Sequence, residues 1–223
     1  MKMLEKIAYP LVFLVAIVGV YFSWTDLPFY EGVYVREDGF VEWLTVVALL
    51  SGAFLSLYRA YILKPFRGTW FSICLVILAA ILIFGAGEEI SWGQRIFNIQ
   101  SPEFFQTHNS QGETNIHNLI VGGKKINKII FGTILGIFVG LYFLVLPVLY
   151  RKIEKVKTLI DSFAIPVPKV FHIVVYLILV GLVELIEGGK KGEILEFAGC
   201  WVFTLLIFAP YNRIIYSRKS FER

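Results

Sequence analysis

Residues 70–87, WFSICLVILAAILIFGAG, form a long apolar run, and residues 88–118, EEISWGQRIFNIQSPEFFQTHNSQGETNIHN, follow it directly. An uncharged run of this length is long enough to cross the hydrocarbon core of a membrane as a helix. The polar segment after it holds two of the chain's three histidines, several carboxylates and Arg95. The stretch therefore predicts a membrane span that leads into a long polar loop equipped for chemistry.

The rest of the chain repeats the apolar pattern. Of its 223 residues, 57% are hydrophobic and 17% are charged, whereas about a quarter of the residues in a soluble domain are charged. We expect an all-α integral membrane protein, one transmembrane helical domain over residues 1–223, built as a bundle of six helices. The first run is interpreted as a retained span because no small-residue cleavage site follows it. The predicted spans are about 8–24, 40–63, 70–87, 129–149, 170–185 and 194–209.

The basic residues predict the orientation, because segments on the cytoplasmic side of a membrane are enriched in Lys and Arg. With both termini in the cytoplasm, the inner segments hold 14 of the 21 basic residues. The basic residues in these inner segments are Lys2, Lys6, Arg59, Lys64, Arg67, Arg151, Lys152, Lys155, Lys157, Lys169, Arg213, Arg218, Lys219 and Arg223. The expected location is the bacterial cytoplasmic (inner) membrane.

The positions of the basic residues and cysteines relative to the apolar runs indicate which partners and disulfides to expect. The net charge of +4 arises from basic residues at the ends of apolar runs, so it does not indicate nucleic-acid binding. Membrane lipid is the expected partner, and protein partners stay open. Cys74 and Cys200 lie inside apolar runs, near opposite faces in this topology, so no disulfide is expected.

Glutamates from separate spans are predicted to meet near the outer face. At about 1.5 Å per helical residue, Glu88 and Glu89 lie roughly 27–29 Å along the third span. Four spans place glutamates at a similar depth, and His117 at the start of the fourth span can join them. The other members of this set are Glu42 in the second span, Glu184 and Glu187 in the fifth, and Glu193 and Glu196 in the sixth.

Carboxylates at this depth are costly, and such residues usually mark a functional site. Several of them together need protons, a cation or a basic partner, for which Arg95 is a candidate. If the helix continues past Gly87, one of its faces carries Glu88, Ser91, Trp92 and Arg95. Alternatively, any one glutamate could extend to the interface or favour a helix N-terminus.

The polar loop offers two interpretations of Glu113. Ser101-Pro102-Glu103 predicts a short helix that carries Phe104 and Phe105 and could act as an interfacial lid. Ser110-Gln111-Gly112-Glu113 fits a capping box at the start of another helix. On that helix Glu113 and His117 would be four residues apart and could both bind one metal ion. Gln111, Asn115 and Asn118 form a neighbouring polar row.

Other motifs are sparse. His108 is interpreted as either a surface residue or a ligand, and His172, near the inner face, as structural. The HExxH, GxSxG, P-loop and GxGxxG signatures are absent. Mixed Glu and His ligation would suit iron, manganese or zinc, and mostly Glu ligation would suit calcium or magnesium.

The pieces EDGFVEW (37–43), GEEISWGQR (87–95) and QGETNIHN (111–118) resemble the signature of a family of uncharacterised bacterial polytopic membrane proteins. That resemblance implies a site and no particular reaction. The piece EDGFVEWLT also faintly resembles the early acidic span of alkaline-ceramidase-like membrane hydrolases. The paired C-terminal histidines of those enzymes have no counterpart here, where the last span carries Glu193 and Glu196.

The leading hypothesis is a membrane-embedded, metal-dependent hydrolase or transferase that acts on a lipid or lipid-linked substrate from the outer leaflet. Alternatives are a proton- or cation-coupled transporter or channel, and a non-catalytic membrane interaction protein. The expected cofactor is a divalent metal ion of unknown identity. The predicted site comprises Glu88, Glu89, Glu113 and His117 as catalytic residues and metal ligands, Glu42 and Glu196 as further ligands, and Trp92, Arg95, Asn115 and Asn118 as substrate-binding residues.

Overall fold

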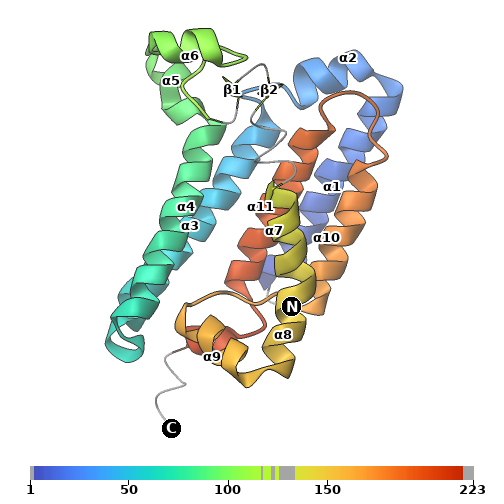
Figure 1. The fold of residues 1–223 in the computed structure, drawn as a ribbon. Helices are drawn as coiled ribbons and strands as arrows, with labels where there is room; N and C mark the ends of the chain where they lie inside the picture. The colour runs from blue at the N-terminus through green and yellow to red at the C-terminus, as the bar shows by residue number, and fades with distance from the viewer. Residues whose placement is uncertain (1–2, 117, 122–123, 126–133, 218–223) are drawn as a thin grey trace.

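The computed structural model describes residues 3–116, 118–121, 124–125 and 134–217. It is a bundle of long helices with short helices gathered at both ends (Figure 1). The α-helices are α1 (Met3–Thr25), α2 (Leu27–Phe29), α3 (Phe40–Arg67), α4 (Thr69–Glu89), α5 (Gln94–Phe97), α6 (Glu103–His108), α7 (Leu135–Gly140), α8 (Leu146–Lys152), α9 (Glu154–Ser162), α10 (Val170–Val183) and α11 (Lys191–Phe208).

Shorter elements complete the chain. The segments η1 (Tyr30–Tyr34) and η4 (Leu141–Val145) are π-helical, and η2 (Ser91–Gly93) and η5 (Arg213–Tyr216) are 3₁₀ turns. Two antiparallel strands of two residues each, β1 (Ile120–Val121) and β2 (Lys124–Lys125), pair Ile120 with Lys125.

Four helical segments in the described part of the chain are long and apolar enough to cross a membrane. They are α1, α3, α4 and the continuous segment α7–η4–α8. Helix α10 is apolar but shorter, and α11 begins with charged residues. The expectation of a helical membrane protein is therefore confirmed, and helices lie at all six predicted spans. Of the predicted span 129–149, residues 129–133 lie outside the described residues.

Helices α3, α4 and α11 meet at Gly52. A Cβ atom at this position would lie 3.1 Å from Leu82 Cδ1 of α4 and 3.3 Å from Thr204 Oγ1 of α11. Thr204 Oγ1 also donates a 2.9 Å hydrogen bond to the Ala48 carbonyl oxygen of α3. In a membrane the hydrophobic effect does not drive helices together, so their association depends on close packing, which glycine permits. This contact fixes the relative positions of the helices that supply most of the site described below.

Helices α1 and α10 run parallel on the other side of α11. Trp24 Nε1 donates a 2.8 Å hydrogen bond to the Leu185 carbonyl oxygen at one end. At the other end His172 Nε2 lies 3.7 Å from Glu5 Oε1, and both side chains are buried. His172 thus sits in a packed interior, as its interpretation as a structural residue expected.

The two ends of the bundle differ in what they carry (Figure 1). One end holds α2, α5, α6 and the β1–β2 pair, and we call it the loop end. The opposite end holds the start of α1, the α3–α4 turn, α9 and η5, and we call it the terminal end. The predicted polar loop and the beginnings or ends of α3, α4 and α11 therefore gather at the loop end.

Candidate functional site

The backbone turns sharply where α4 ends at Glu89. Ser91 and Trp92 have φ values of 45° and 55°, and Gly93 has φ 74°. Positive φ is costly for residues that carry a Cβ atom. The indole of Trp92 folds back over Gly87, where a Cβ atom would lie 2.8 Å from Trp92 Cε3. Helix α4 continues past Gly87 only as far as Glu89. The shared helical face expected from Glu88 to Arg95 does not form, because this turn redirects the chain across the end of the helix.

Glu88 holds the polar loop against α4. Its carboxylate accepts a 2.9 Å hydrogen bond from Trp92 Nε1 and a 2.6 Å bond from the Ile116 backbone N–H. The residue is 6% exposed. A buried carboxylate that accepts an indole and a backbone N–H in this way has a clear structural role. In the described geometry Glu88 therefore joins two segments of the site, whatever else it does.

The loop after α6 is built around two buried asparagines. Asn109 Nδ2 donates to Asn115 Oδ1 at 2.9 Å, and Asn109 Oδ1 accepts from the Gln111 backbone N–H at 2.9 Å. Asn115 Nδ2 in turn donates to Ser91 Oγ at 2.8 Å. Asn118 Nδ2 donates to Gln111 Oε1 at 2.6 Å. The predicted polar row thus makes a network, but it serves to fold the loop.

The predicted capping box is wrong. Residues 110–116 form turns and bends, so Glu113 does not begin a helix and the i, i+4 geometry with His117 is not available. His117 itself lies outside the described residues. The earlier short helix is confirmed as α6, although no side-chain cap precedes it. Gly112, with φ 71°, turns the chain where the helix was expected to start.

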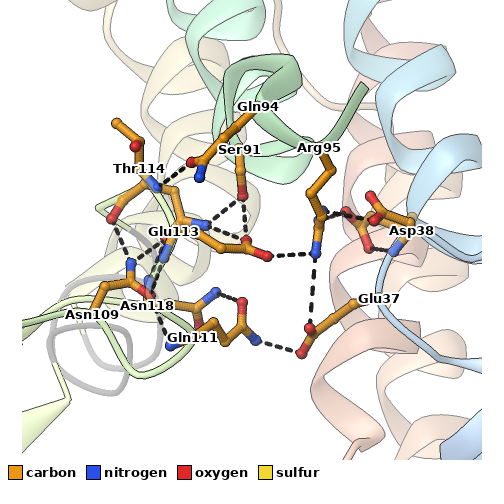
Figure 2. A network of polar contacts seen from close by, with 12 residues as sticks. Glu37, Asp38, Ser91, Gln94, Arg95, Asn109, Gln111, Glu113, Thr114 and Asn118 are labelled. Atoms are coloured by element: carbon orange, nitrogen blue, oxygen red, sulfur yellow. Dashed lines mark hydrogen bonds and ion pairs between the residues drawn. The ribbon is translucent and has the colours of Figure 1, made fainter. Parts of the chain in front are cut away.

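Glu113 and Arg95 form the centre of this network (Figure 2). Glu113 accepts hydrogen bonds from Ser91 Oγ at 2.5 Å and from Arg95 Nη1 at 2.6 Å. A charge-assisted bond of this kind is short and strong. Because Glu113 also lies 3.4 Å from Asn115 Nδ2, its carboxylate joins α5, the turn after α4 and the loop.

Arg95 also reaches across to the segment that precedes α3 (Figure 2). Its Nε lies 2.6 Å from Asp38 Oδ2 as an ion pair that lacks hydrogen-bond geometry. Longer ion-pair distances of 3.7 and 3.9 Å join its Nη atoms to Glu42 and Glu37. Gln111 donates a short hydrogen bond to the same Glu37. Arg95, predicted as a substrate-binding residue, thus ties the loop to α3.

Beneath this network, carboxyl groups from α3, α4 and α11 converge. Glu89 interacts electrostatically with Glu196, and more weakly with Glu42 and Glu193. Glu193 interacts in turn with Glu196 and Glu42. All four are half-buried. We call Glu42, Glu89, Glu193 and Glu196 the carboxyl cluster.

Positive charge around the carboxyl cluster is sparse and peripheral. Arg95 Nη2 lies 3.7 Å from Glu42, and Lys190 interacts with Glu193. Glu42 also accepts a 2.7 Å hydrogen bond from the Asp38 backbone N–H. Carboxylates held together repel unless a proton, a cation or a basic group lies between them. The cluster is thus suited to bind a proton or a cation.

Glu184, which the depth estimate grouped with these residues, points elsewhere. It forms an ion pair with Lys191 at 2.6 Å, and its side chain is 59% exposed. The depth estimate correctly placed Glu184 near the loop end of the bundle, but the expectation that its side chain faces the other glutamates is wrong. Helix α10 ends at Val183, so the backbone beyond it no longer follows the helical period used for the estimate.

The residues present define what metal chemistry is available. In the described ranges, no group of three or more His, Cys, Asp or Glu side chains is arranged to hold a metal ion. Oxygen ligands from Glu42, Glu89, Glu193 and Glu196 would suit a hard divalent cation if the side chains closed around it. The metal therefore stays a prediction.

Exposed aromatic side chains surround the loop end. Trp92, Phe97 and Phe104 are all at least half exposed, and His108 stacks on Phe104 with ring centroids 4.7 Å apart. Aromatic side chains are enriched where a membrane meets water. Trp92 is therefore placed to contact lipid, whereas Asn115 is buried in the loop. Substrate binding by either residue stays a prediction.

Sequence reasoning missed several residues of the network. Asn109 is a buried hydrogen-bonding centre, and Asp38 pairs with Arg95. Glu193 was grouped with the converging glutamates, with a helix N-terminus as the alternative, and it belongs to the carboxyl cluster. One usable signal was the acidic residue spacing at 193 and 196, which places both carboxylates on one face of a helix. No periodic signal marked Asn109, because it lies outside the helices, directly after α6.

Comparison with protein families, with curated proteins and with solved structures finds no match to this chain. The site must therefore be interpreted from its own geometry.

Proposed function

We propose that this chain crosses the membrane six times, with the loop end outside and the terminal end in the cytoplasm. Helix α1 begins and η5 ends at the same end of the bundle (Figure 1), which supports an even number of crossings. Helices α10 and α11 join the four long apolar segments as the remaining spans. The concentration of Lys and Arg at the terminal end supports its cytoplasmic location.

We further propose that the protein is a membrane-embedded enzyme whose carboxyl cluster performs acid–base chemistry on a lipid or lipid-linked substrate. The convergence of Glu42, Glu89, Glu193 and Glu196 from three helices carries this proposal. Ionisable groups within membrane-spanning helices are costly and mark sites of function. Hydrolysis or group transfer is the reaction class that such groups serve best.

Two neighbouring carboxyl groups that interact electrostatically can divide the roles of general acid and general base. In this proposal Glu89 and Glu196 share one proton, so one group can activate water while the other protonates the leaving group. Glu42 and Glu193 set the electrostatic field around the pair. A divalent cation bound by these oxygens would supply Lewis-acid stabilisation of developing negative charge.

The surroundings of the carboxyl cluster support a substrate from the outer leaflet. Trp92, Phe97 and Phe104 expose aromatic surface at the loop end, where acyl chains and headgroups meet. Arg95 joins the folded loop, through Glu113, to Glu42 of the cluster. In this proposal the substrate enters sideways from lipid and reaches the carboxyl groups without breaking these contacts.

The direct test is to incubate the purified protein in nanodiscs with a total bacterial lipid extract and to follow lipid turnover by mass spectrometry. We expect a substrate to be consumed by the wild type and not by Glu89→Gln or Glu196→Gln. Glu184→Gln is the matched control, because Glu184 lies near the same end but pairs with Lys191. Equal turnover by Glu89→Gln and the wild type would refute acid–base catalysis by the cluster.

A second candidate function is proton- or cation-coupled transport. The Glu89–Glu196 pair favours it, because carboxyl groups that share a proton can also bind and release one during transport. Proton or Na⁺ flux in liposomes, lost in Glu196→Gln and retained in Glu184→Gln, would support transport. Lipid turnover without such flux would favour the enzyme.

A further inference from the structure

A groove of about 260 Å³ runs between α8 and α10 at the terminal end, away from the carboxyl cluster. Its walls are apolar side chains from η4, α8 and α10, among them Leu144, Val148, Val170 and Ile173. A groove on the outside of a membrane bundle faces acyl chains.

Two basic residues stand at the end of this groove. Arg151 and Lys152 line it, and both are exposed. The guanidinium of Arg151 lies 4.7 Å from the centroid of the Tyr211 ring, an arrangement that favours a defined position for a cation. A groove that is apolar along its length and basic at its mouth matches a phospholipid whose headgroup is anionic.

Helix α9 gives a second observation that points to the same leaflet surface. It lies across the terminal end (Figure 1) and carries exposed Lys155 and Leu159. Lys157 of the same helix pairs with Glu154 at 3.0 Å, and Phe163, which follows the helix, is 48% exposed. Short helices with one charged face and one apolar face lie in the plane of the membrane interface. The headgroup layer would therefore surround the mouth of the groove.

We propose that the groove between α8 and α10 binds one anionic glycerophospholipid, with an acyl chain along Leu144, Val148 and Ile173 and its phosphate at Arg151 and Lys152. Basic pockets between transmembrane helices are a recognised mode of binding anionic headgroups. The site is separate from the proposed catalytic cluster, so either proposal can fail without the other.

The test uses native mass spectrometry of the full chain in detergent, titrated with dioleoyl phosphatidylglycerol or dioleoyl phosphatidylcholine. We expect one phosphatidylglycerol to be retained, and at least tenfold weaker retention of phosphatidylcholine. Arg151→Gln with Lys152→Gln should weaken phosphatidylglycerol binding about tenfold or more, since it removes both basic residues that would bind the phosphate. Val148→Trp should fill the groove and weaken binding similarly while it leaves both charges in place.

The matched control is Lys64→Gln with Arg213→Gln, which removes two exposed basic residues at the same end outside the groove. We expect it to change phosphatidylglycerol affinity less than twofold. Equal loss in this control, or unchanged binding in Val148→Trp, would show that only diffuse surface charge attracts the lipid and would overturn the proposal. Equal retention of phosphatidylcholine would also overturn it. All variants are compared at matched monodispersity and helix content.

Discussion

The two ends of this bundle differ in how their charged side chains are partnered. At the terminal end, Arg59 is 9% exposed and donates to the Ile207 carbonyl oxygen at 2.6 Å and to the Phe208 carbonyl oxygen at 3.3 Å. Its guanidinium also lies 4.4 Å from the centroid of the Tyr216 ring. Asp161 there accepts a 2.9 Å hydrogen bond from the Tyr150 hydroxyl. At the loop end, carboxyl groups of three helices face one another.

We infer from this difference that the charged groups at the terminal end stabilise the fold, whereas those of the carboxyl cluster serve function. Arg59 satisfies carbonyl groups at the end of α11, which would otherwise lack a donor. In the carboxyl cluster Glu42 accepts one backbone hydrogen bond and lies near Arg95, but Glu89, Glu193 and Glu196 interact chiefly with one another. Their repulsion is one that a fold optimised for stability would avoid. Proteins commonly give up stability at functional sites in this way. The predictions below test the distinction, from the largest expected effect to the smallest.

Arg59→Ala should have the largest effect on stability. It removes a buried cation and leaves two carbonyl groups of α11 without their donor, at a cost of about 3 kcal/mol in the free energy of unfolding. Denaturation in mixed detergent micelles measures this change. Arg213→Ala, an exposed residue at the same end, should change stability little. A small effect of Arg59→Ala would mean that the terminal end does not depend on its buried charge.

Glu88→Gln should destabilise the protein although it is nearly isosteric. One oxygen of Glu88 accepts the Ile116 backbone N–H and the other accepts the Trp92 indole N–H. An amide NH₂ in place of either oxygen would face a donor, and we expect a loss of about 2 kcal/mol. Thermal unfolding and Trp92 fluorescence report the change. Stability equal to wild type would remove the structural role assigned to this residue.

Arg95→Gln should release the polar loop with a moderate effect on stability. It breaks the pairs with Asp38 and Glu113, but its side chain is 29% exposed, so solvent screening limits the loss to about 1 kcal/mol. Faster proteolysis within residues 98–116 would show the release, and high salt should reduce the difference from wild type. Exposed Arg36 is the control. Unchanged proteolysis would contradict the proposed role of Arg95.

Glu89→Gln should have the smallest effect on stability, and of the opposite sign. Removal of one charge from the carboxyl cluster relieves repulsion, and we expect a gain of about 0.5 kcal/mol in metal-free buffer. The substitutions Glu88→Gln and Glu89→Gln therefore compare, at adjacent positions, a carboxylate that stabilises the fold with one that belongs to the carboxyl cluster. A loss of stability in Glu89→Gln as large as that in Glu88→Gln would place Glu89 among the structural charges.

Part of the site could be predicted from the sequence because helix geometry and membrane thickness fix depth. Glu42, Glu89 and Glu196 lie close to the ends of helices that begin or end near the predicted positions. Depth did not predict direction, however. Glu184 and Glu196 have similar predicted depths, yet one pairs with Lys191 at the surface and the other faces Glu89.

The loop could not be predicted, because hydrogen bonds between segments distant in the sequence override local signals. Ser110 to Glu113 fits a capping box, but Glu113 instead binds Ser91 and Arg95, which lie about twenty residues earlier. A local capping bond competes poorly with a charge-assisted bond to an arginine. The positive φ angles at Ser91 and Trp92 also could not be predicted, because serine and tryptophan normally avoid positive φ.

The sequence alone determined that this chain forms membrane-spanning helices and that its polar loop lies next to carboxylates, because span length and hydropathy are local properties. Only the tertiary structure decided which carboxylates share a site, since that depends on the rotation of each helix about its axis. Close packing at Gly52 sets that rotation for α3, α4 and α11. It thereby brings Glu42, Glu89 and Glu196 together while Glu88, one residue away from Glu89, turns to hold the loop.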